Sequence, residues 1–413
     1  MTIVVFEDER WGWFAPLSLT HHLSELTWGT KTLLQAVRSL VPGEEVVLWG
    51  RSTLREAVRE RIGIDYNTSP KGRVLLVNAR ARPTRALGQV MGGEKAGFAV
   101  IADGELVVAR TGLGGVVPGE MSTRRLHSLA KPLDRRELGP GFLFKGPWDM
   151  VESNGMAIAE QGERLANQAP APGGIELKGP PLSLRMADSA EVGKFVSIDT
   201  RPGPVILDES SVVESYSMIT GPCYIGPRSR LRSALIRSGT SIFENCRIGG
   251  EVENSIIMPF TNKTHFGFVG DSILGSWVNI GAGGTFSNLK NTYGTVRLQK
   301  DGKKVDTGLV KFGPVVGDMA KVSIGALVYA GKTLGVASQV TGLVDSNVPS
   351  FTYKGGEGTE LVELQLDSVL ETQRRMMERR GQELSREEEA LVRSVFAATA
   401  QERRAAGVRK GTL

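Results

Sequence analysis

One of the four histidines of the chain, His265, lies in a stretch that is rich in glycine and in small polar residues. The stretch from Thr261 to Gly284 reads TNKTHFGFVGDSILGSWVNIGAGG. An imidazole accepts a proton near neutral pH, so a histidine in such a stretch is a candidate general base. A lone histidine is more often a satisfied structural residue, so these residue types alone leave both interpretations open.

A six-residue repeat of aliphatic side chains lies on both sides of His265. It comprises Leu207, Val213, Ile219, Ile225 and Leu231, then Ile242 and Ile248, and later Val310, Val316, Val322, Val328, Leu334 and Val340. A period of six fits neither an α-helix nor an alternating strand. It is typical of a parallel β-helix, in which short strands stack and the repeated side chain points inward. The repeat therefore predicts a β-helix domain over 175–355.

The chain on either side of the repeat has different patterns. Residues 1–165 alternate short apolar runs with helical segments, which predicts an α/β domain with a parallel, doubly wound sheet. Its expected elements are strands over 3–6, 46–48 and 74–77, helices over 31–40 and 52–61 with Ser52 as an N-cap, and a hairpin over 98–109. A Pro- and Gly-rich linker is expected over 167–181.

The last part of the chain, 356–413, predicts a helical tail. One amphipathic helix is expected from Leu361 towards Arg380, with Gly381 as its stop. A second is expected after Ser385, because Ser385 and Glu388 have the spacing of a capping box.

Composition excludes several classes of protein. The net charge is +5, and more than half of this excess lies in 371–410, where ten Lys and Arg residues stand beside seven Asp and Glu residues. Such mixed charge predicts a solvated face and no nucleic-acid partner. Two cysteines, Cys223 and Cys246, are too few for a disulfide framework or a closed zinc site. With no long apolar run and no basic leader, we expect a cytoplasmic protein without a membrane partner.

The region around His265 also carries a specific set of motifs. His265 precedes Val269-Gly270-Asp271, and further on come Asn279-Ile280-Gly281-Ala282-Gly283, Asn288, and Lys311-Phe312 before Val316-Gly317-Asp318. In order and spacing this set resembles the acetyltransferase half of the bifunctional GlmU-type enzymes. Those enzymes join a Rossmann-like sugar-phosphate nucleotidyltransferase domain to a left-handed β-helix of hexapeptide repeats. The archaeal members are the most similar, because they carry an insertion that ends like Val305-Asp306-Thr307-Gly308.

The resemblance implies roles for particular residues. His265 would be the general base that takes a proton from the 2-amino group of a glucosamine 1-phosphate-like substrate, as that nitrogen attacks the thioester of acetyl-CoA. Asn279 and Lys311 match positions that hold the sugar phosphate. Ala282 and Asn288 match positions near the thioester, where a backbone N–H can stabilise an oxyanion.

Some residues depart from the family pattern. Phe268 stands where the family has a tyrosine, and Leu289 and Glu253 stand where bacterial members have a tyrosine and a lysine. Lys263, two residues before His265, is the candidate to supply the missing positive charge next to the substrate. A zinc-dependent carbonic anhydrase of the same fold is excluded, because it needs about three histidine ligands for each metal and this region holds one.

The N-terminal part resembles a divergent group of GlmU-like nucleotidyltransferase domains. The resemblance rests on FEDERWGWFAPLSLTHHL from Phe6, on LLVNAR over 75–80 and on PWDMVE over 147–152, with His21-His22 in place of Arg-Pro. The usual Gly-rich phosphate-binding loop is absent near the N-terminus. The residue expected to bind Mg²⁺ after the third strand is Asn78 or Arg80 here. Asn78 and Arg80 are therefore candidate nucleotide-binding residues, and Asp149 is the candidate ligand of Mg²⁺.

Together these patterns predict an enzyme that transfers an acetyl group from acetyl-CoA to an amino-sugar 1-phosphate. Nucleotidyl transfer that forms a UDP-sugar is the expected second activity, and a homotrimer is the expected assembly. Two alternatives stay open. One is a non-catalytic protein that binds a sugar nucleotide on a trimeric β-helix scaffold, and the other is a nucleotidyltransferase alone.

Overall fold

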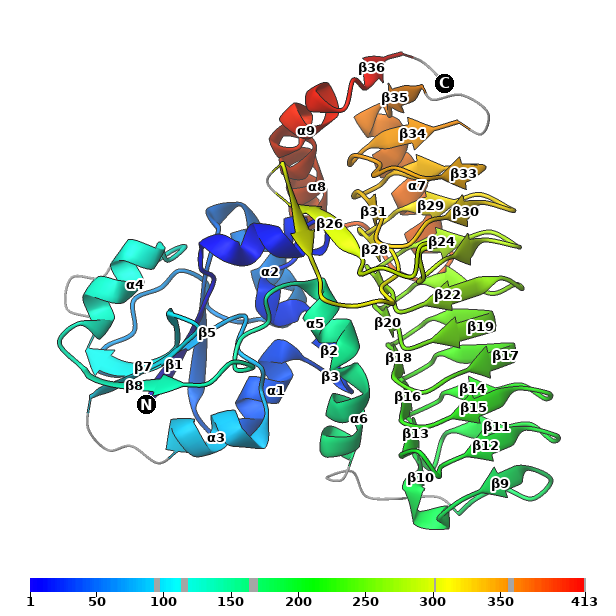
Figure 1. Cartoon of the computed structure of the whole chain (residues 1–413), viewed down its shortest axis with the longest axis horizontal. Coiled ribbons are helices and arrows are strands. Elements are labelled where there is room, and N and C mark those ends of the chain that lie inside the picture. Colours follow the sequence, from blue (N-terminus) through cyan, green and yellow to red (C-terminus); the bar gives the residue numbers. More distant parts are fainter. Residues whose placement is uncertain (93–96, 113–117, 163–169, 301, 356–359, 412–413) are drawn as a thin grey trace. The chain divides into compact units, whose positions relative to one another are not determined.

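The computed structural model describes residues 1–92, 97–112, 118–162, 170–300, 302–355 and 360–411 (Figure 1). They form two compact units. The first contains Met1–Leu26, Lys31–Gly146 and Ser385–Ser394, and the second contains Thr27–Thr30, Pro147–Leu384 and Val395–Leu413. The expected linker lies partly outside the described residues, at 163–169. The division into domains over 1–165, 175–355 and 356–413 stays a prediction.

The first unit is built on a six-stranded sheet with the order β4-β1-β5-β7-β6-β8. The strands are β1 (Thr2–Phe6), β4 (Glu45–Trp49), β5 (Arg73–Asn78), β6 (Phe98–Ala102), β7 (Glu105–Gly112) and β8 (Asp134–Leu138). β1 pairs in parallel with β4 and β5, as the apolar runs predict for buried α/β strands. β7 runs antiparallel to both β5 and β6, so the sheet is mixed.

Local sequence accounts for much of this unit. The expected hairpin is confirmed as β6 and β7, and both turn residues, Asp103 and Gly104, have positive φ. The helices are α1 (Leu33–Leu40), α2 (Arg55–Ile62), α3 (Arg85–Gly92) and α4 (Thr123–Ala130). The expectation that Ser52 caps a helix is wrong. Ser52 begins the 3₁₀ turn η4 (Ser52–Leu54), and the N-cap of α2 is Leu54, which makes no side-chain capping bond.

The second unit is a parallel β-helix with three ladders of short strands, drawn in Figure 1 as the stack from β9 to β34. The first ladder is β10 (Leu184–Met186), β13 (Val205–Leu207), β16 (Cys223–Ile225), β18 (Thr240–Ile242), β20 (Ile256–Ile257), β23 (Ile273–Leu274), β28 (Val315–Val316) and β31 (Thr333–Leu334). The second is β11 (Glu191–Val192), β14 (Val212–Val213), β17 (Arg230–Ile236), β19 (Arg247–Glu253), β21 (Asn262–Lys263), β24 (Asn279–Ile280), β29 (Lys321–Val322), β32 (Gln339–Val340) and β34 (Thr352–Lys354). The third is β9 (Glu176–Lys178), β12 (Ser197–Asp199), β15 (Met218–Thr220), the second halves of β17 and β19, β22 (Phe268–Gly270), β25 (Thr285–Phe286), β30 (Leu327–Val328) and β33 (Leu343–Val344).

The aliphatic repeat forms the core of this β-helix, which confirms the fold class expected from its period. Every residue of the repeat is buried in one cluster except Val310. Val310 is 47% exposed, so its assignment to the core is wrong. It lies in an excursion between β25 and β28 that contains the antiparallel hairpin β26 (Arg297–Lys300) and β27 (Lys303–Asp306). The coil resumes only at β28, and the six-residue spacing of Val310 from Val316 is therefore coincidental.

Helices flank the β-helix within the second unit. α5 (Pro147–Glu152) leads into α6 (Asn154–Gly162), and Asn154 Nδ2 donates to the carbonyl of Gly239 at 2.8 Å and to Ser241 Oγ at 2.9 Å. These bonds hold α6 on the first ladder.

The tail contains β35 (Leu361–Glu363), α7 (Leu366–Glu378), α8 (Arg386–Ala398), α9 (Ala400–Ala405) and β36 (Arg409–Lys410). The expected start of its first helix is wrong, because Leu361 lies in β35, which pairs with β34. The expected stop at Gly381 is confirmed by its φ of +63°, and Ser385 Oγ accepts a hydrogen bond from the Glu388 amide at 3.1 Å. Within the described ranges, no helix is both long and apolar enough to cross a bilayer.

Candidate active site

His265 lines a pocket of about 370 Å³ on the surface of the β-helix. The remaining lining residues come from successive coils and from the end of α7: Arg247, Asn262, Thr264, Asn279, Ile280, Gly281, Ala282, Ile324, Arg379 and Arg380. The volume lies in the range of small-molecule sites. Three of the residues expected to act in acetyl transfer, His265, Asn279 and Ala282, therefore lie side by side in one chain.

The coil below His265 is shaped by glycine. A Cβ atom on Gly249 would come within 2.0 Å of the Thr264 carbonyl oxygen. A Cβ atom on Gly250 would come within 2.9 Å of the His265 carbonyl oxygen, and Gly250 has a φ of +68° that favours glycine. These two positions let β19 approach the turn that presents His265.

Lys263 lies in the interior of the β-helix and not in the pocket. It pairs with Ile248, a core residue, and its side chain is 1% exposed. Its Nζ donates to the backbone carbonyls of Gly249 at 2.6 Å and of His265 at 2.7 Å. Burial lowers the pKa of Lys263 to about 8. The expectation that Lys263 supplies charge to the substrate is therefore replaced by a role in holding the His265 backbone.

The NIGAGG segment forms the other side of the pocket. Asn279 pairs with Asn262 on one side and with Lys321 on the other, so the three side chains share one outward row. A Cβ atom on Gly281 would meet the backbone nitrogen of Ile324 at 2.6 Å, and Gly283 has a φ of +76°. The glycines thus allow close stacking of the next coil, while Asn279 and Ala282 face the pocket.

Three arginines line the pocket that the sequence patterns did not predict as site residues. Arg247 lies on β19, whereas Arg379 and Arg380 follow α7. Arg380 Nη2 donates a hydrogen bond to Asn262 Oδ1, which ties the end of α7 to the coil that carries His265. The only signal in the sequence was an Arg-Arg pair directly before Gly381, and it suits a helix C-terminus equally well.

The other residues expected in acetyl transfer form a second cluster. Asn288 Nδ2 donates to Asp271 Oδ2 at 2.5 Å, and a Cβ atom on Gly270 would contact both Asn288 and the ring of Phe268. Lys311 is exposed, and its Nζ lies 3.9 Å from Glu253 Oε1. Phe268, Asn288 and Lys311 do not line the His265 pocket.

In the first unit, Asn78 and Arg80 bind other protein groups. Arg80 is 1% exposed, and its guanidinium donates to Asp8, to Glu105 Oε2 at 2.6 Å and to the Phe144 carbonyl at 3.0 Å. Asn78 Nδ2 donates to Asp8 Oδ2 at 2.8 Å. Burial lowers the pKa of Arg80, but the adjacent carboxylate of Asp8 outweighs burial, and the net pKa is raised. The structure thus places both candidate nucleotide ligands in an internal polar network.

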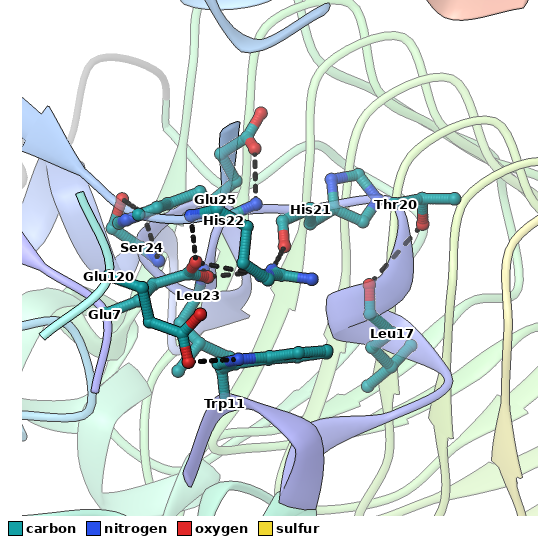
Figure 2. A network of polar contacts seen from close by, with 12 residues as sticks. Glu7, Trp11, Leu17, Thr20, His21, His22, Leu23, Ser24, Glu25 and Glu120 are labelled. Atoms are coloured by element: carbon teal, nitrogen blue, oxygen red, sulfur yellow. Dashed lines mark hydrogen bonds and ion pairs between the residues drawn. The ribbon is translucent and has the colours of Figure 1, made fainter. Parts of the chain in front are cut away.

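A second buried ion pair lies at the carboxyl ends of β1 and β4, the edge where open α/β sheets bind ligands. Arg51 donates to Glu7 at 2.8 and 2.9 Å. The Leu23 amide donates to the same carboxylate at 3.0 Å, and Figure 2 labels both Leu23 and Glu7. His22 is buried, with Nε2 3.2 Å from the Trp49 carbonyl oxygen. Nδ1 of His21 lies 2.8 Å from Arg61 Nη1. The His21-His22 pair therefore serves to build this edge.

Asp149 was the candidate ligand of Mg²⁺. It is buried on α5 in the second unit, and its backbone carbonyl accepts a hydrogen bond from Ser153 Oγ at 2.6 Å. Among the described residues, no group of three or more His, Cys, Asp or Glu side chains is placed to hold a metal ion. Asn78 and Arg80 are both bound to Asp8, so no residue of this network is assigned to Mg²⁺.

Residues 3–169 match the sugar nucleotidyl transferase family. The chain is also 36% identical over 140 residues to a bifunctional GlmU protein of Methanococcus vannielii, an alignment that spans 32% of each chain. It is 31% identical over 146 residues to a bifunctional sugar-1-phosphate nucleotidylyltransferase/acetyltransferase of Sulfurisphaera tokodaii, over 33% of this chain and 35% of that one. These alignments thus span about a third of the length of the relatives.

Solved structures give a weaker likeness. A UDP-N-acetylglucosamine acyltransferase from Francisella novicida is 15% identical, over 57% of this chain and 87% of that chain, with a TM-score of 0.30. The β-helix of this chain is defined by its own strand pairing.

Proposed function

We propose that the β-helix catalyses acyl transfer from acetyl-CoA to the amino group of an amino-sugar 1-phosphate. The observation that carries the proposal is the grouping of His265, Asn279 and Ala282 around one pocket, in the order and spacing of the resembled motif. The similarity to one relative named as a bifunctional GlmU protein and to another named as a bifunctional sugar-1-phosphate nucleotidylyltransferase/acetyltransferase supports the same reaction class.

The proposed chemistry needs one base and one oxyanion site. The imidazole of His265 accepts a proton from the amino group, whose nitrogen attacks the thioester carbonyl carbon. The tetrahedral oxyanion that forms is stabilised by the backbone N–H of Ala282. As it collapses, the C–S bond breaks, the sulfur leaves as a thiolate that takes up a proton, and the amide product remains. Asn279 orients the sugar in the pocket.

We propose a homotrimer in which each active site uses two subunits. Phe266, next to His265, is 72% exposed, and Ile324 in the pocket wall is 77% exposed. Leu327 and Leu343, which pair with each other in the third ladder, are also exposed. Exposed apolar side chains around a pocket favour burial by a partner. In such an assembly the second cluster, with Phe268, Asn288 and Lys311, would face the His265 pocket of an adjacent subunit.

Thiol release tests the proposal. The full chain is mixed with acetyl-CoA and a set of amino-sugar 1-phosphates, and free thiol and the N-acetylated product are both measured. The proposal expects equal amounts of thiol and product with at least one amino-sugar 1-phosphate. Binding of sugar nucleotides without thiol release would instead favour the alternative, a non-catalytic protein on the same scaffold.

Nucleotidyl transfer is proposed as a second activity, because residues 3–169 match a sugar nucleotidyl transferase family. No residue is assigned to Mg²⁺, and Arg80 and Asn78 are held by Asp8, so any nucleotide would be bound by other groups. The test is release of pyrophosphate by the full chain from UTP and a sugar 1-phosphate, with and without Mg²⁺. Failure to release pyrophosphate from any nucleoside triphosphate would leave acetyl transfer as the sole proposed activity.

A further inference from the structure

Three arginines from two distant parts of the sequence line the His265 pocket. Arg247 Nη1 donates to the carbonyls of Arg228 at 2.9 Å and of Cys246 at 3.2 Å. Arg380 is held by its hydrogen bond to Asn262 Oδ1. Arg247 and Arg380 are half-buried, and Arg379 is exposed beside them on the pocket wall. The first two side chains are therefore held in place by neutral acceptors.

No carboxylate of the described residues forms an ion pair with this cluster. In the described part of the chain, none of the ion pairs involves Arg247, Arg379 or Arg380, although exposed arginines of the same tail are paired, as Arg375 is with Glu371. Burial lowers the pKa of Arg247, and the positive charge of Arg380 lowers it further. Like charges that are held together without a counter-ion are stabilised when an anion binds between them.

We infer that Arg247, Arg379 and Arg380 form the phosphate-binding part of the His265 site, and that the end of α7 thereby selects a phosphorylated substrate. This inference rests on the proposed function. Guanidinium groups bind phosphate through paired, charge-assisted hydrogen bonds, which a neutral pocket lacks. The resemblance implied that Asn279 and Lys311 hold the sugar phosphate. Asn279 lines this pocket together with the arginines, whereas Lys311 lies outside it.

The placement of a cation at a helix C-terminus does not account for the cluster. The helix dipole favours Arg379 and Arg380 after α7, but it gives no reason for Arg247 to stand beside them on β19. Two substrates of the proposed reaction carry phosphate: the amino-sugar 1-phosphate and the coenzyme A ester. The position of all three arginines in the same pocket as the base favours the sugar phosphate, and the experiment separates the two sources.

The kinetic test uses R247Q, R379Q and R380Q in the full chain. R375Q is the control, because Arg375 is an exposed arginine of the same helix outside the pocket. Loss of one charge-assisted contact is expected to raise KM for the phosphorylated substrate by roughly tenfold to a hundredfold. A rise in KM for the amino-sugar 1-phosphate assigns the site to the sugar, and a rise for acetyl-CoA assigns it to the coenzyme. Unchanged KM values for both substrates in all three variants would overturn the inference.

A direct binding test keeps this inference separate from the proposed function. Inorganic phosphate is titrated into the wild-type chain, R247Q, R247K and R375Q, and binding is followed by calorimetry. We expect R247Q to lose at least tenfold in affinity, R247K to keep most of it and R375Q to equal the wild type, with melting curves confirming that each variant is folded. This result would support the anion site even if no acetyl transfer were found. Equal phosphate binding by wild type and R247Q would contradict it.

Discussion

The ammonium group of Lys263 donates a hydrogen bond to the backbone carbonyl of His265, with Nζ and O separated by 2.7 Å. The same group donates to the Gly249 carbonyl one coil away, at 2.6 Å. A buried side chain at the register position of the aliphatic core thus fixes the turn that presents the proposed base.

Replacing Lys263 by Met should impair acetyl transfer without removing any group that contacts substrate. Met keeps the apolar stem but leaves the carbonyls of Gly249 and His265 without their donor, so the turn loses its support. We expect kcat to fall by roughly tenfold. K354M is a matched control, because Lys354 is also buried in the β-helix and its Nζ donates to the Leu343 carbonyl at 2.6 Å. Equal loss of kcat in K354M would contradict a specific role for Lys263.

The lowered pKa of Lys263 predicts a pH-dependent stability. Its pKa is about 8 in the folded chain against an ordinary value near 10.5, so between these values the unfolded chain binds more protons. The free energy of unfolding contributed by this lysine therefore rises as pH increases from about 8 to about 10.5. Denaturant unfolding of wild type and K263M across this range checks it. The free energy of unfolding of the wild type minus that of K263M should increase with rising pH, and a constant value of this difference would contradict the prediction.

The buried pair of Arg80 and Asp8 predicts a structural role for both residues. Removing Arg80 leaves the buried Asp8 carboxylate without its guanidinium partner, which typically costs about 3–5 kcal/mol. Removing Asp8 leaves Arg80 with Glu105 as its remaining ion-pair partner, so the loss should be smaller. R80A and D8A should each lower the free energy of unfolding, and the double variant should lower it by clearly less than the sum of the two. Additive losses would show that the two side chains are not coupled. Because R80A removes a buried ion pair, reduced nucleotide binding by R80A would reflect lost stability and would not identify Arg80 as a nucleotide ligand.

The exposed apolar side chains next to the pocket predict the subunit interface. F266D and I324D should convert the proposed trimer to monomers, because each would bury a carboxylate in an apolar contact. Light scattering measures the mass in solution. L182D is the control, since Leu182 is 78% exposed and is not a residue of the pocket. A trimer that survives both F266D and I324D would place the interface elsewhere.

Sequence reasoning succeeded where the information is local and periodic. The six-residue spacing predicts the β-helix because each coil repeats one constraint, an inward aliphatic side chain on every face. It failed where the period is interrupted. Val310 has the six-residue spacing but lies in the excursion. Lys263 pairs with the core residue Ile248 on the next coil and therefore points inward, because that coil is shorter than three hexapeptides and the six-residue spacing is broken there. These outcomes depend on which residues pair across coils.

Long-range partners explain the remaining differences at the site. Nothing near Arg80 in the sequence reveals that Asp8 lies within hydrogen-bond distance, or that Glu105 shares the same guanidinium. Likewise, Arg247 and Arg380 meet only because α7 returns to the coil that carries Asn262. The mixed charge of the tail predicts solvated pairs such as Arg375 with Glu371. It does not indicate that Arg379 and Arg380 form no such ion pair within the described chain.

His265 is the proposed base for acetyl transfer, and the rate of the H265A variant tests this role most directly. The His265 side chain is exposed, so its removal should leave the fold and the oligomeric state unchanged. With acetyl-CoA and the best amino-sugar 1-phosphate at saturation, kcat of H265A should fall by roughly 10²–10⁴ relative to wild type, as expected for loss of a general base. A folded H265A variant that keeps a rate close to that of the wild type would show that His265 is not the base.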